Sequence, residues 1–235
     1  HALAVLVRVD ERIVVVSSVK ENPLETASRL LITQLNSDGS LDNTFGSGGN
    51  VLHNIFANPF ATAKLSPEGK ILVAGTLDFN AHLIRLNADG SLDNTFGNGG
   101  TVLANLVGPF YENRDLLIQP DGKLVVMGRR GRTGRGIDIA VVRYLDDGSL
   151  DSTFGTGGIK IVEDGGGRAE AGRGVVQSDG KILFAAQLTR DDRRSMAVLR
   201  LNADGSEDTT FGTGGLAEID FGIDHGSGGS DILIT

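Results

Sequence analysis

Short runs of apolar residues recur along the chain, separated by polar stretches rich in Gly and Asp. One representative stretch has apolar runs at residues 116–118, 124–127, 139–144 and 159–162. Runs of this length between turn residues predict β-strands, and the Pro-Asp-Gly turn between the first two predicts a tight hairpin. No stretch has apolar residues at convincing helical spacing. The pattern therefore predicts an all-β protein.

The same pattern of runs and turns occurs four times along the chain. A long motif, Asn-x-Asp-Gly-Ser-x-Asp-x-Thr-Phe-Gly-x-Gly-Gly, stands with small variations at residues 36–49, 87–100, 145–158 and 202–215. A second motif, Asp/Glu-Gly-Lys before an apolar run, keeps step with the long motif in three copies. In the first copy it is worn to Asp10-Glu11-Arg12, without its Gly. A period of about 55 residues indicates a propeller, a solenoid or an array of small domains.

The second strand of each copy is apolar on both faces, at residues 13–16, 71–74, 124–127 and 182–185. Such strands belong in a sheet that is covered on both sides. Stacked blades around an axis provide that setting, so we predict a β-propeller, or a fragment of one, with about four four-stranded antiparallel blades. An open β-solenoid and independent small domains are the competing interpretations. The predicted blades span residues 2–56, 60–106, 113–162 and 174–221, and residues 228–235 resemble the first strand of a further repeat.

The long motif has two interpretations. As a structural corner, its Gly adopts positive φ, its Ser caps a single helical turn, and its Phe packs inward. These core positions are Phe45, Phe96, Phe154 and Phe211. As a calcium loop, it offers oxygen ligands at alternate positions, but one copy lacks the Asn and no Glu closes any loop. We favour the structural corner and predict no metal.

Both motifs resemble the delta-60 repeat family. The resemblance rests on Arg-Leu-Asn-Ala-Asp-Gly-Ser-Leu-Asp-Asn-Thr-Phe-Gly-Asn-Gly-Gly at residues 85–100 and Asp-Gly-Lys-Leu-Val-Val-Met-Gly at residues 121–128. It implies a propeller-like fold, a bacterial protein that is secreted or exposed at the cell surface, and a role in binding, adhesion or scaffolding. The first copy departs from the pattern, with Gln34 where the other copies have Arg85, Arg143 and Arg200.

Composition removes several classes of function. The net charge of −8 argues against a nucleic-acid partner, and no apolar run is long enough to span a membrane. The chain has no Cys, and its four His residues show no metal-ligand spacing. No nucleophile motif, phosphate loop or glycosidase pair stands out from the repeat. We therefore predict a chain that is not an enzyme and has no cofactor.

One segment departs from the acidic character of the chain. Four arginines fall within residues 129–135, and two more follow in the next copy, so we predict a basic loop patch that binds a protein or an acidic glycan. Its residues are Arg129, Arg130, Arg132, Arg135, Arg193 and Arg194. The alternatives are a structural spacer in a larger fibre and a hydrolase-associated propeller with a site on the blade face. Because the sequence starts at His1 without Met, we also expect it to be part of a longer chain or assembly.

Overall fold

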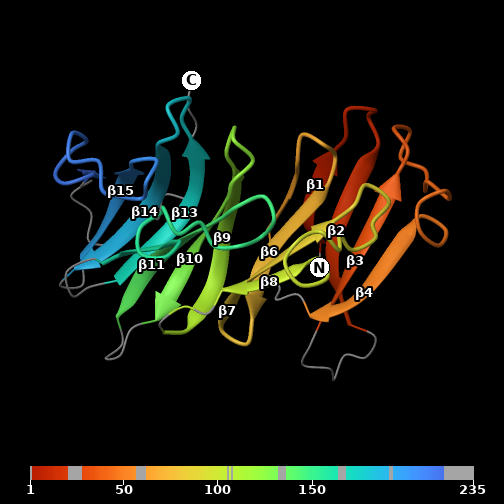
Figure 1. Cartoon of the computed structure of the whole chain (residues 1–235), viewed down its shortest axis with the longest axis horizontal. Helices are drawn as coiled ribbons and strands as arrows, with labels where there is room; N and C mark the ends of the chain where they lie inside the picture. The colour runs from red at the N-terminus through yellow and green to blue at the C-terminus, as the bar shows by residue number, and fades with distance from the viewer. Residues whose placement is uncertain are drawn as a thin grey trace. The chain divides into compact units, whose positions relative to one another are not determined.

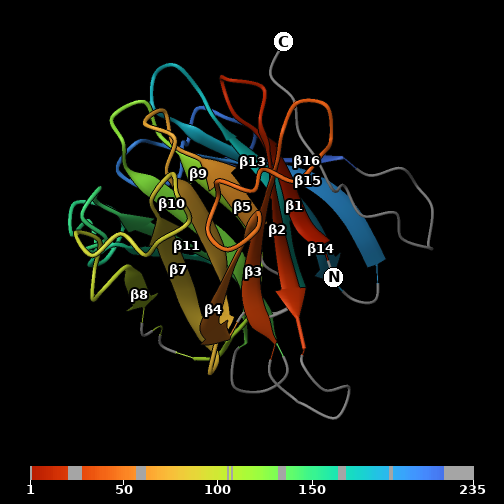
Figure 2. The same ribbon diagram turned by 90° about the vertical axis from the view of Figure 1, so that its right-hand side faces the viewer.

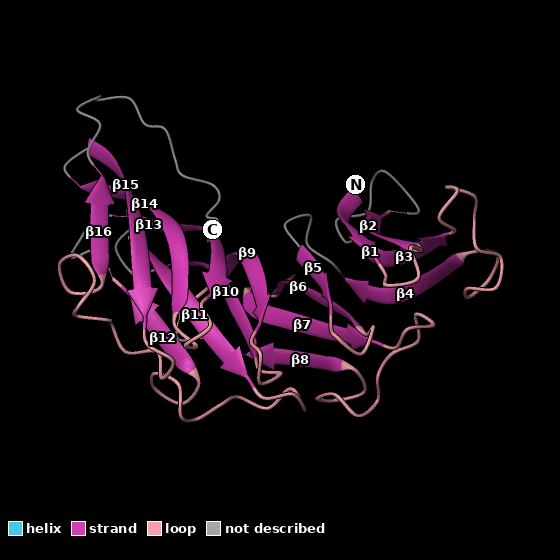
Figure 3. Cartoon of the chain, turned by 90° about the horizontal axis from the view of Figure 1, so that it is seen from above, coloured by secondary structure: helices cyan, strands magenta, loops and turns pink. Residues whose placement is uncertain are grey.

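A computed structural model describes residues 2–20, 28–56, 62–104, 106, 108–131, 136–163, 168–190 and 193–219. These residues form strands and loops, and no helix occurs among them (Figure 3). Blades 1 and 2 consist of β1 (Ala2–Val7), β2 (Ile13–Val19), β3 (Arg29–Leu35), β4 (Asn50–Phe56), β5 (Thr62–Leu65), β6 (Ile71–Leu77), β7 (Asn80–Leu86) and β8 (Thr101–Ala104). Blades 3 and 4 consist of β9 (Phe110–Ile118), β10 (Leu124–Gly131), β11 (Ile137–Tyr144), β12 (Ile159–Val162), β13 (Arg168–Val176), β14 (Ile182–Arg190), β15 (Arg193–Leu201) and β16 (Leu216–Ile219). Accordingly, no described segment is a helix long and apolar enough to cross a membrane.

Each blade is an antiparallel sheet whose strands lie in the order of the sequence, as Figure 1 shows for β1 to β4 and Figure 2 for β1, β2 and β3. A single parallel bridge between Ile137 and Arg168 joins the sheets of blades 3 and 4. The chain divides into two compact units, one with blades 1 and 2 and one with blades 3 and 4, separated between residues 103 and 104. The predicted all-β class and four-stranded blades are thus confirmed.

The second motif forms the hairpin turn between the first and second strands of each blade. In blade 2 the Ser66 and Lys70 backbones are joined by a hydrogen bond of 2.8 Å, and Gly69 has a φ of 78°. Glu11 takes the equivalent place in blade 1 with a φ of 66°, a region that residues other than Gly rarely occupy. The worn copy therefore keeps the turn in spite of having lost its Gly.

In each unit one core cluster lies between the two blades. Blade 1 contributes Val14, Val16, Leu30 and Ile32, and blade 2 covers them with Ile71, Val73, Ile84 and Leu86. The equivalent cluster between blades 3 and 4 includes Val125, Met127, Phe184 and Leu199. Three of the four predicted core Phe residues, Phe45, Phe96 and Phe154, are buried, whereas Phe211 is only half-buried.

Two sequence expectations need correction. The second strand is buried on both faces in β6, but in β2 Val14 and Val16 are buried while Ile13 and Val15 are half-buried. Successive strand residues point to opposite faces, so only one face of blade 1 is fully covered. In addition, β9 begins at Phe110 and β13 at Arg168, before the predicted starts at 113 and 174. The further strand predicted at 228–235 lies outside the described residues.

Candidate binding groove and aspartate centres

The long motif folds as a corner without a helix, and its capping residue is an Asp rather than the Ser that we predicted. Asp42 Oδ1 accepts hydrogen bonds from the Thr44 amide at 3.0 Å and the Thr44 hydroxyl at 2.5 Å. The Phe45 amide then donates to the Asp42 carbonyl at 2.9 Å. The Ser40 hydroxyl instead donates to Asp38 two residues earlier. The same bonds recur in the other three copies.

Each capping Asp also joins the two motifs of its blade, and we call Asp42, Asp93, Asp151 and Asp208 with their partners the aspartate centres. In blade 4, Asp208 Oδ2 accepts from Arg200 Nε at 2.7 Å and from Lys181 Nζ at 2.9 Å. The Arg200 guanidinium lies 4.4 Å from the centroid of the Phe211 ring, a cation–π distance. Blades 2 and 3 repeat this arrangement with Arg85 and Arg143. This shared partner explains why the two motifs stay in phase.

Blade 1 keeps its centre with different residues. Gln34 Nε2 donates to Asp42 Oδ2 at 2.8 Å, and Arg12 takes the lysine's place at 3.2 Å. The missing guanidinium comes from Arg8, which donates to Gln34 Oε1 at 2.9 Å and to the Ala88 carbonyl of blade 2 at 2.7 Å. In unit 2, Arg143 makes the matching contact to the carbonyl of Ala203. Arg8 thus substitutes for the arginine that position 34 has lost.

The motif's carboxylates face protein donors. Asp89 Oδ1 accepts from the Ser91 amide and hydroxyl, and Asp93 is paired with Lys70 and Arg85. Burial alone would raise the pKa of Asp151, but hydrogen bonds from Thr153 and the charges of Arg143 and Lys123 lower that pKa to about 2. Among the described residues no group of three or more His, Cys, Asp or Glu side chains is placed to hold a metal ion. This geometry favours the structural corner over the calcium loop.

The predicted basic patch differs in structure from the loop that we expected. Arg129 and Arg130 lie within β10, where Arg129 pairs with Glu112 at 3.2 Å and Arg130 pairs with the buried Asp138 at 3.0 Å. Arg193 and Arg194 belong to β15, with Arg194 exposed. Arg132 and Arg135 lie outside the described residues. Ligand binding at these six arginines stays a prediction, but two of them already have carboxylate partners.

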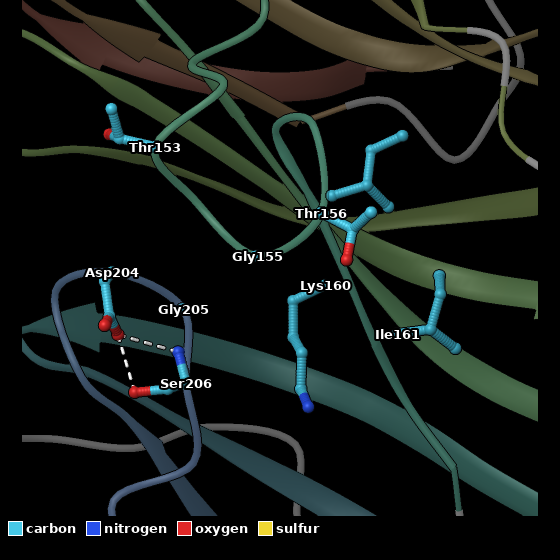
Figure 4. A pocket seen from close by; sticks show the side chains of 9 residues that line it. Thr153, Gly155, Thr156, Lys160, Ile161, Asp204, Gly205 and Ser206 are labelled. Carbon is cyan, nitrogen blue, oxygen red and sulfur yellow. Dashed lines mark hydrogen bonds between the residues drawn. The ribbon is translucent and has the colours of Figure 1, made fainter.

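A groove lies between the corners of blades 3 and 4, and we call it the Lys160 groove (Figure 4). Its volume is about 560 Å³. Blade 3 supplies Thr153, Gly155, Thr156, Ile159, Lys160 and Ile161, and blade 4 supplies Asp204, Gly205 and Ser206. The Gly155 amide donates to the Asp204 carbonyl at 2.8 Å, so the two walls are held together by a backbone hydrogen bond.

The groove lies where Lys160 breaks the repeat. Val51 and Val102 hold the same position in blades 1 and 2, and a Cβ placed on the preceding corner Gly, Gly46 or Gly97, would collide with the valine Cγ2. The three atoms nearest to a Cβ on Gly155 would instead all be backbone atoms, and the Lys160 side chain pairs with Glu207 at 3.0 Å. Figure 4 shows the extended Lys160 side chain beside Ser206.

Sequence reasoning missed this groove, although a signal was present. The position reads Val51, Val102, Lys160 and Ala217 in the four copies, so a column-by-column comparison marks the lysine as the polar exception. The sequence also left the histidines unexplained. His53 Nε2 lies 2.8 Å from the Gly90 carbonyl, between the corners of blades 1 and 2, where blade 3 has Val162.

Four-stranded antiparallel blades that carry one repeated corner define a β-propeller repeat protein. Residues 10–45, 67–96, 119–154 and 177–211 match the model of a family described as "Domain of unknown function (DUF5122) beta-propeller". These matches cover more than half of the chain, which therefore belongs to this family.

The other comparisons are more distant. A comparison with curated proteins gave no match. Among solved structures, a glycoside hydrolase aligns with 84% of this chain and 44% of its own, at 10% identity and a TM-score of 0.42. A hypothetical protein from Leishmania major aligns with 86% of this chain and 63% of its own, at 12% identity and a TM-score of 0.37. The chain thus spans less than two thirds of the length of either structure.

Proposed function

We propose that this chain is a non-catalytic binding module of a secreted or surface-exposed bacterial protein, and that the Lys160 groove binds an acidic glycan. The observation that carries the proposal is the groove itself, which opens where Lys160 replaces the valine of the repeat. Its volume of about 560 Å³ lies within the range of sites for small ligands. Resemblance to delta-60 repeats supports the bacterial, extracytoplasmic setting.

The lining supports a ligand rich in hydroxyl groups. Thr153, Thr156 and Ser206 bring hydroxyls, and Ile159 and Ile161 add apolar surface for the C–H faces of a sugar ring. Asp204 Oδ1 accepts from the Ser206 amide and hydroxyl, and these bonds lower the Asp204 pKa, so the carboxylate stays ionised. An ionised carboxylate accepts hydrogen bonds from ligand hydroxyls.

Lys160 supports an acidic rather than a neutral ligand. Its present partner is Glu207, whose side chain is half exposed, and an exposed ion pair of this kind contributes only about 0–1 kcal/mol. A ligand carboxylate can therefore compete with Glu207 for Lys160, while Asp204 accepts hydrogen bonds from ligand hydroxyls. The non-catalytic assignment is supported by the aspartate centres, in which the repeated polar residues are engaged in holding each blade together.

Isothermal titration with two tetrasaccharides tests the proposal. One alternates glucuronic acid with N-acetylglucosamine, and the other is the neutral tetramer of N-acetylglucosamine. We expect the acidic probe to bind more tightly and its affinity to fall with added salt, since an ion pair contributes. Lys160→Val, which restores the residue of blades 1 and 2, should abolish binding without unfolding the protein. The matched control Lys20→Val, at an exposed lysine of blade 1, should bind like the wild type. Wild-type affinity in Lys160→Val, or no binding of either probe, would refute the proposal.

A further inference from the structure

In both units the same two faces of successive blades pack against each other. We call the face that carries Val14 and Val16 in blade 1 the trailing face, and the face that carries Ile71 and Val73 in blade 2 the leading face. In unit 1 the trailing face of blade 1 packs on the leading face of blade 2. In unit 2 the trailing face of blade 3, with Val125 and Met127, packs on the leading face of blade 4, with Ile182 and Phe184. The repeat therefore specifies which face covers which.

Blade 1 has a leading face of its own, and it is open. Val5 and Val7 lie opposite Val15 and Ile13 on this face, and they are 64% and 66% exposed. The equivalent residues on the leading face of blade 2 include Ala63, Ile71 and Val73, which are at most 4% exposed. The difference arises because blade 1 covers the leading face of blade 2. The apolar residues of blade 1 thus form a surface shaped for the trailing face of another blade.

Blade 4 presents a trailing face with the matching chemistry. Its residues are Leu183 and Ala185 on β14, Met196 and Val198 on β15, and Ala217 and Ile219 on β16, which lie opposite one another across the sheet. Leu183, Met196 and Val198 are half-buried, and Ile219 is 44% exposed. One chain thus carries both an open leading face and its complement.

The corner residues give a second, independent indication. In both units the Phe of one blade lies against the corner Gly of the next, because a Cβ on Gly90 would meet the Phe45 ring and one on Gly205 would meet the Phe154 ring. In blade 1 the equivalent Gly39 has no atom within 4 Å of its Cβ position. The half-buried Phe211 of blade 4 is the corresponding ring on the other open face. The space beside Gly39 is therefore empty, and the Phe211 ring is partly exposed to solvent.

We propose that two copies of this chain associate, with the trailing face of blade 4 of one copy on the leading face of blade 1 of the other. In this arrangement Phe211 packs over Gly39, as Phe45 packs over Gly90. Arg200 donates to the Ser37 carbonyl, as Arg143 donates to the Ala203 carbonyl within unit 2. The contact joins two different faces and is therefore heterologous, so each copy uses one face in the contact and offers the other face to a further copy.

Light scattering coupled to size exclusion, over a range of protein concentrations, tests the proposal. We expect the wild-type mass to rise with concentration to at least twice the chain mass of 24.6 kDa. Val7→Lys places an ammonium group in the apolar contact, and it should raise the dissociation constant at least about tenfold. Val9→Lys is the matched control, since Val9 follows β1 and is 103% exposed, and the equivalent Pro67 of blade 2 stays exposed beside blade 1.

A variant of the trailing face of blade 4 shows which two faces meet in the dimer. Ile219→Lys should weaken the dimer as Val7→Lys does, because leading and trailing faces meet. If Ile219→Lys leaves the dimer intact while Val7→Lys dissociates it, two leading faces pair and the proposal is wrong. A wild-type mass of 24.6 kDa at every concentration would also overturn it, as for a chain whose open face takes a blade of a longer polypeptide. If Val9→Lys dissociates the protein as strongly as Val7→Lys does, the leading face of blade 1 is not the interface and the proposal is wrong.

Discussion

Arg8 supplies the guanidinium that Gln34 lacks. We therefore predict that the effect of Gln34→Arg on the free energy of unfolding has opposite signs with and without Arg8. With Arg8 present, Gln34→Arg would place two guanidinium groups together and remove the hydrogen bond between Arg8 Nε and Gln34 Oε1. With Arg8 replaced by Ala, the same substitution would restore the arrangement of the other blades, in which Arg85 pairs with Asp93 at 2.7 Å and lies over Phe96. We therefore expect Gln34→Arg to destabilise the wild type and to stabilise Arg8→Ala.

The structure sets the size of each effect. Arg8 makes three hydrogen bonds, to Gln34 at 2.9 Å and to the carbonyls of Gly69 and Ala88 at 3.0 and 2.7 Å. Buried bonds from a charged donor contribute about 1.5–3 kcal/mol each, but Arg8 is half-exposed, so we expect Arg8→Ala to cost about 2 kcal/mol in total. Gln34→Arg should cost about 1 kcal/mol with Arg8 present and recover about 1 kcal/mol without it. The coupling energy is then about 2 kcal/mol.

Hydrogen exchange with mass spectrometry is the suitable assay. The chain has no Trp, and it divides into two compact units, so a single optical signal would not separate the unfolding of one unit from that of the other. Peptides from β3 and β7 report on unit 1, and peptides from β11 and β15 serve as an internal control. If Gln34→Arg has the same sign in both backgrounds, Arg8 does not substitute for the missing arginine.

Two further predictions follow from buried groups. Burial lowers the pKa of His82 to about 4 from its ordinary value of 6.5, so the unfolded state takes up a proton before the folded state does as the pH falls. The contribution of His82 to the free energy of unfolding is therefore complete above pH 6.5 and falls by about 3 kcal/mol towards pH 4. His82→Leu, which introduces the residue that blade 1 has at the equivalent Leu31, should flatten this pH dependence in urea titrations. Asp115 Oδ2 accepts from the Gly174 amide of the neighbouring blade at 3.0 Å, so Asp115→Ala should cost about 2 kcal/mol and speed exchange at Gly174. A smaller loss is expected in Asp115→Asn, which keeps one acceptor, and unchanged exchange in the Ala variant would contradict this role.

The strands and corners were predictable because they depend on local sequence. Apolar runs and turn residues locate the strands, and Gly at positive φ locates the corners, as at Gly90. The aspartate centres were not predicted, since Asp208 pairs with Lys181, which lies 27 residues earlier in the sequence. The same limit applies to Arg129, whose partner Glu112 comes from a neighbouring strand. Pairing between side chains becomes visible only when strand register is known.

The contact from Arg143 to the Ala203 carbonyl has a consequence for how such chains grow. A backbone carbonyl is present whatever the residue, so the arginine of one blade finds its acceptor in any blade that follows. Each copy thus carries both halves of the junction, and duplication of the coding segment would add a blade without requiring a new interface to evolve. In blade 1, where position 34 is Gln, Arg8 makes the same contact to the carbonyl of Ala88, so the junction does not depend on one position of the repeat.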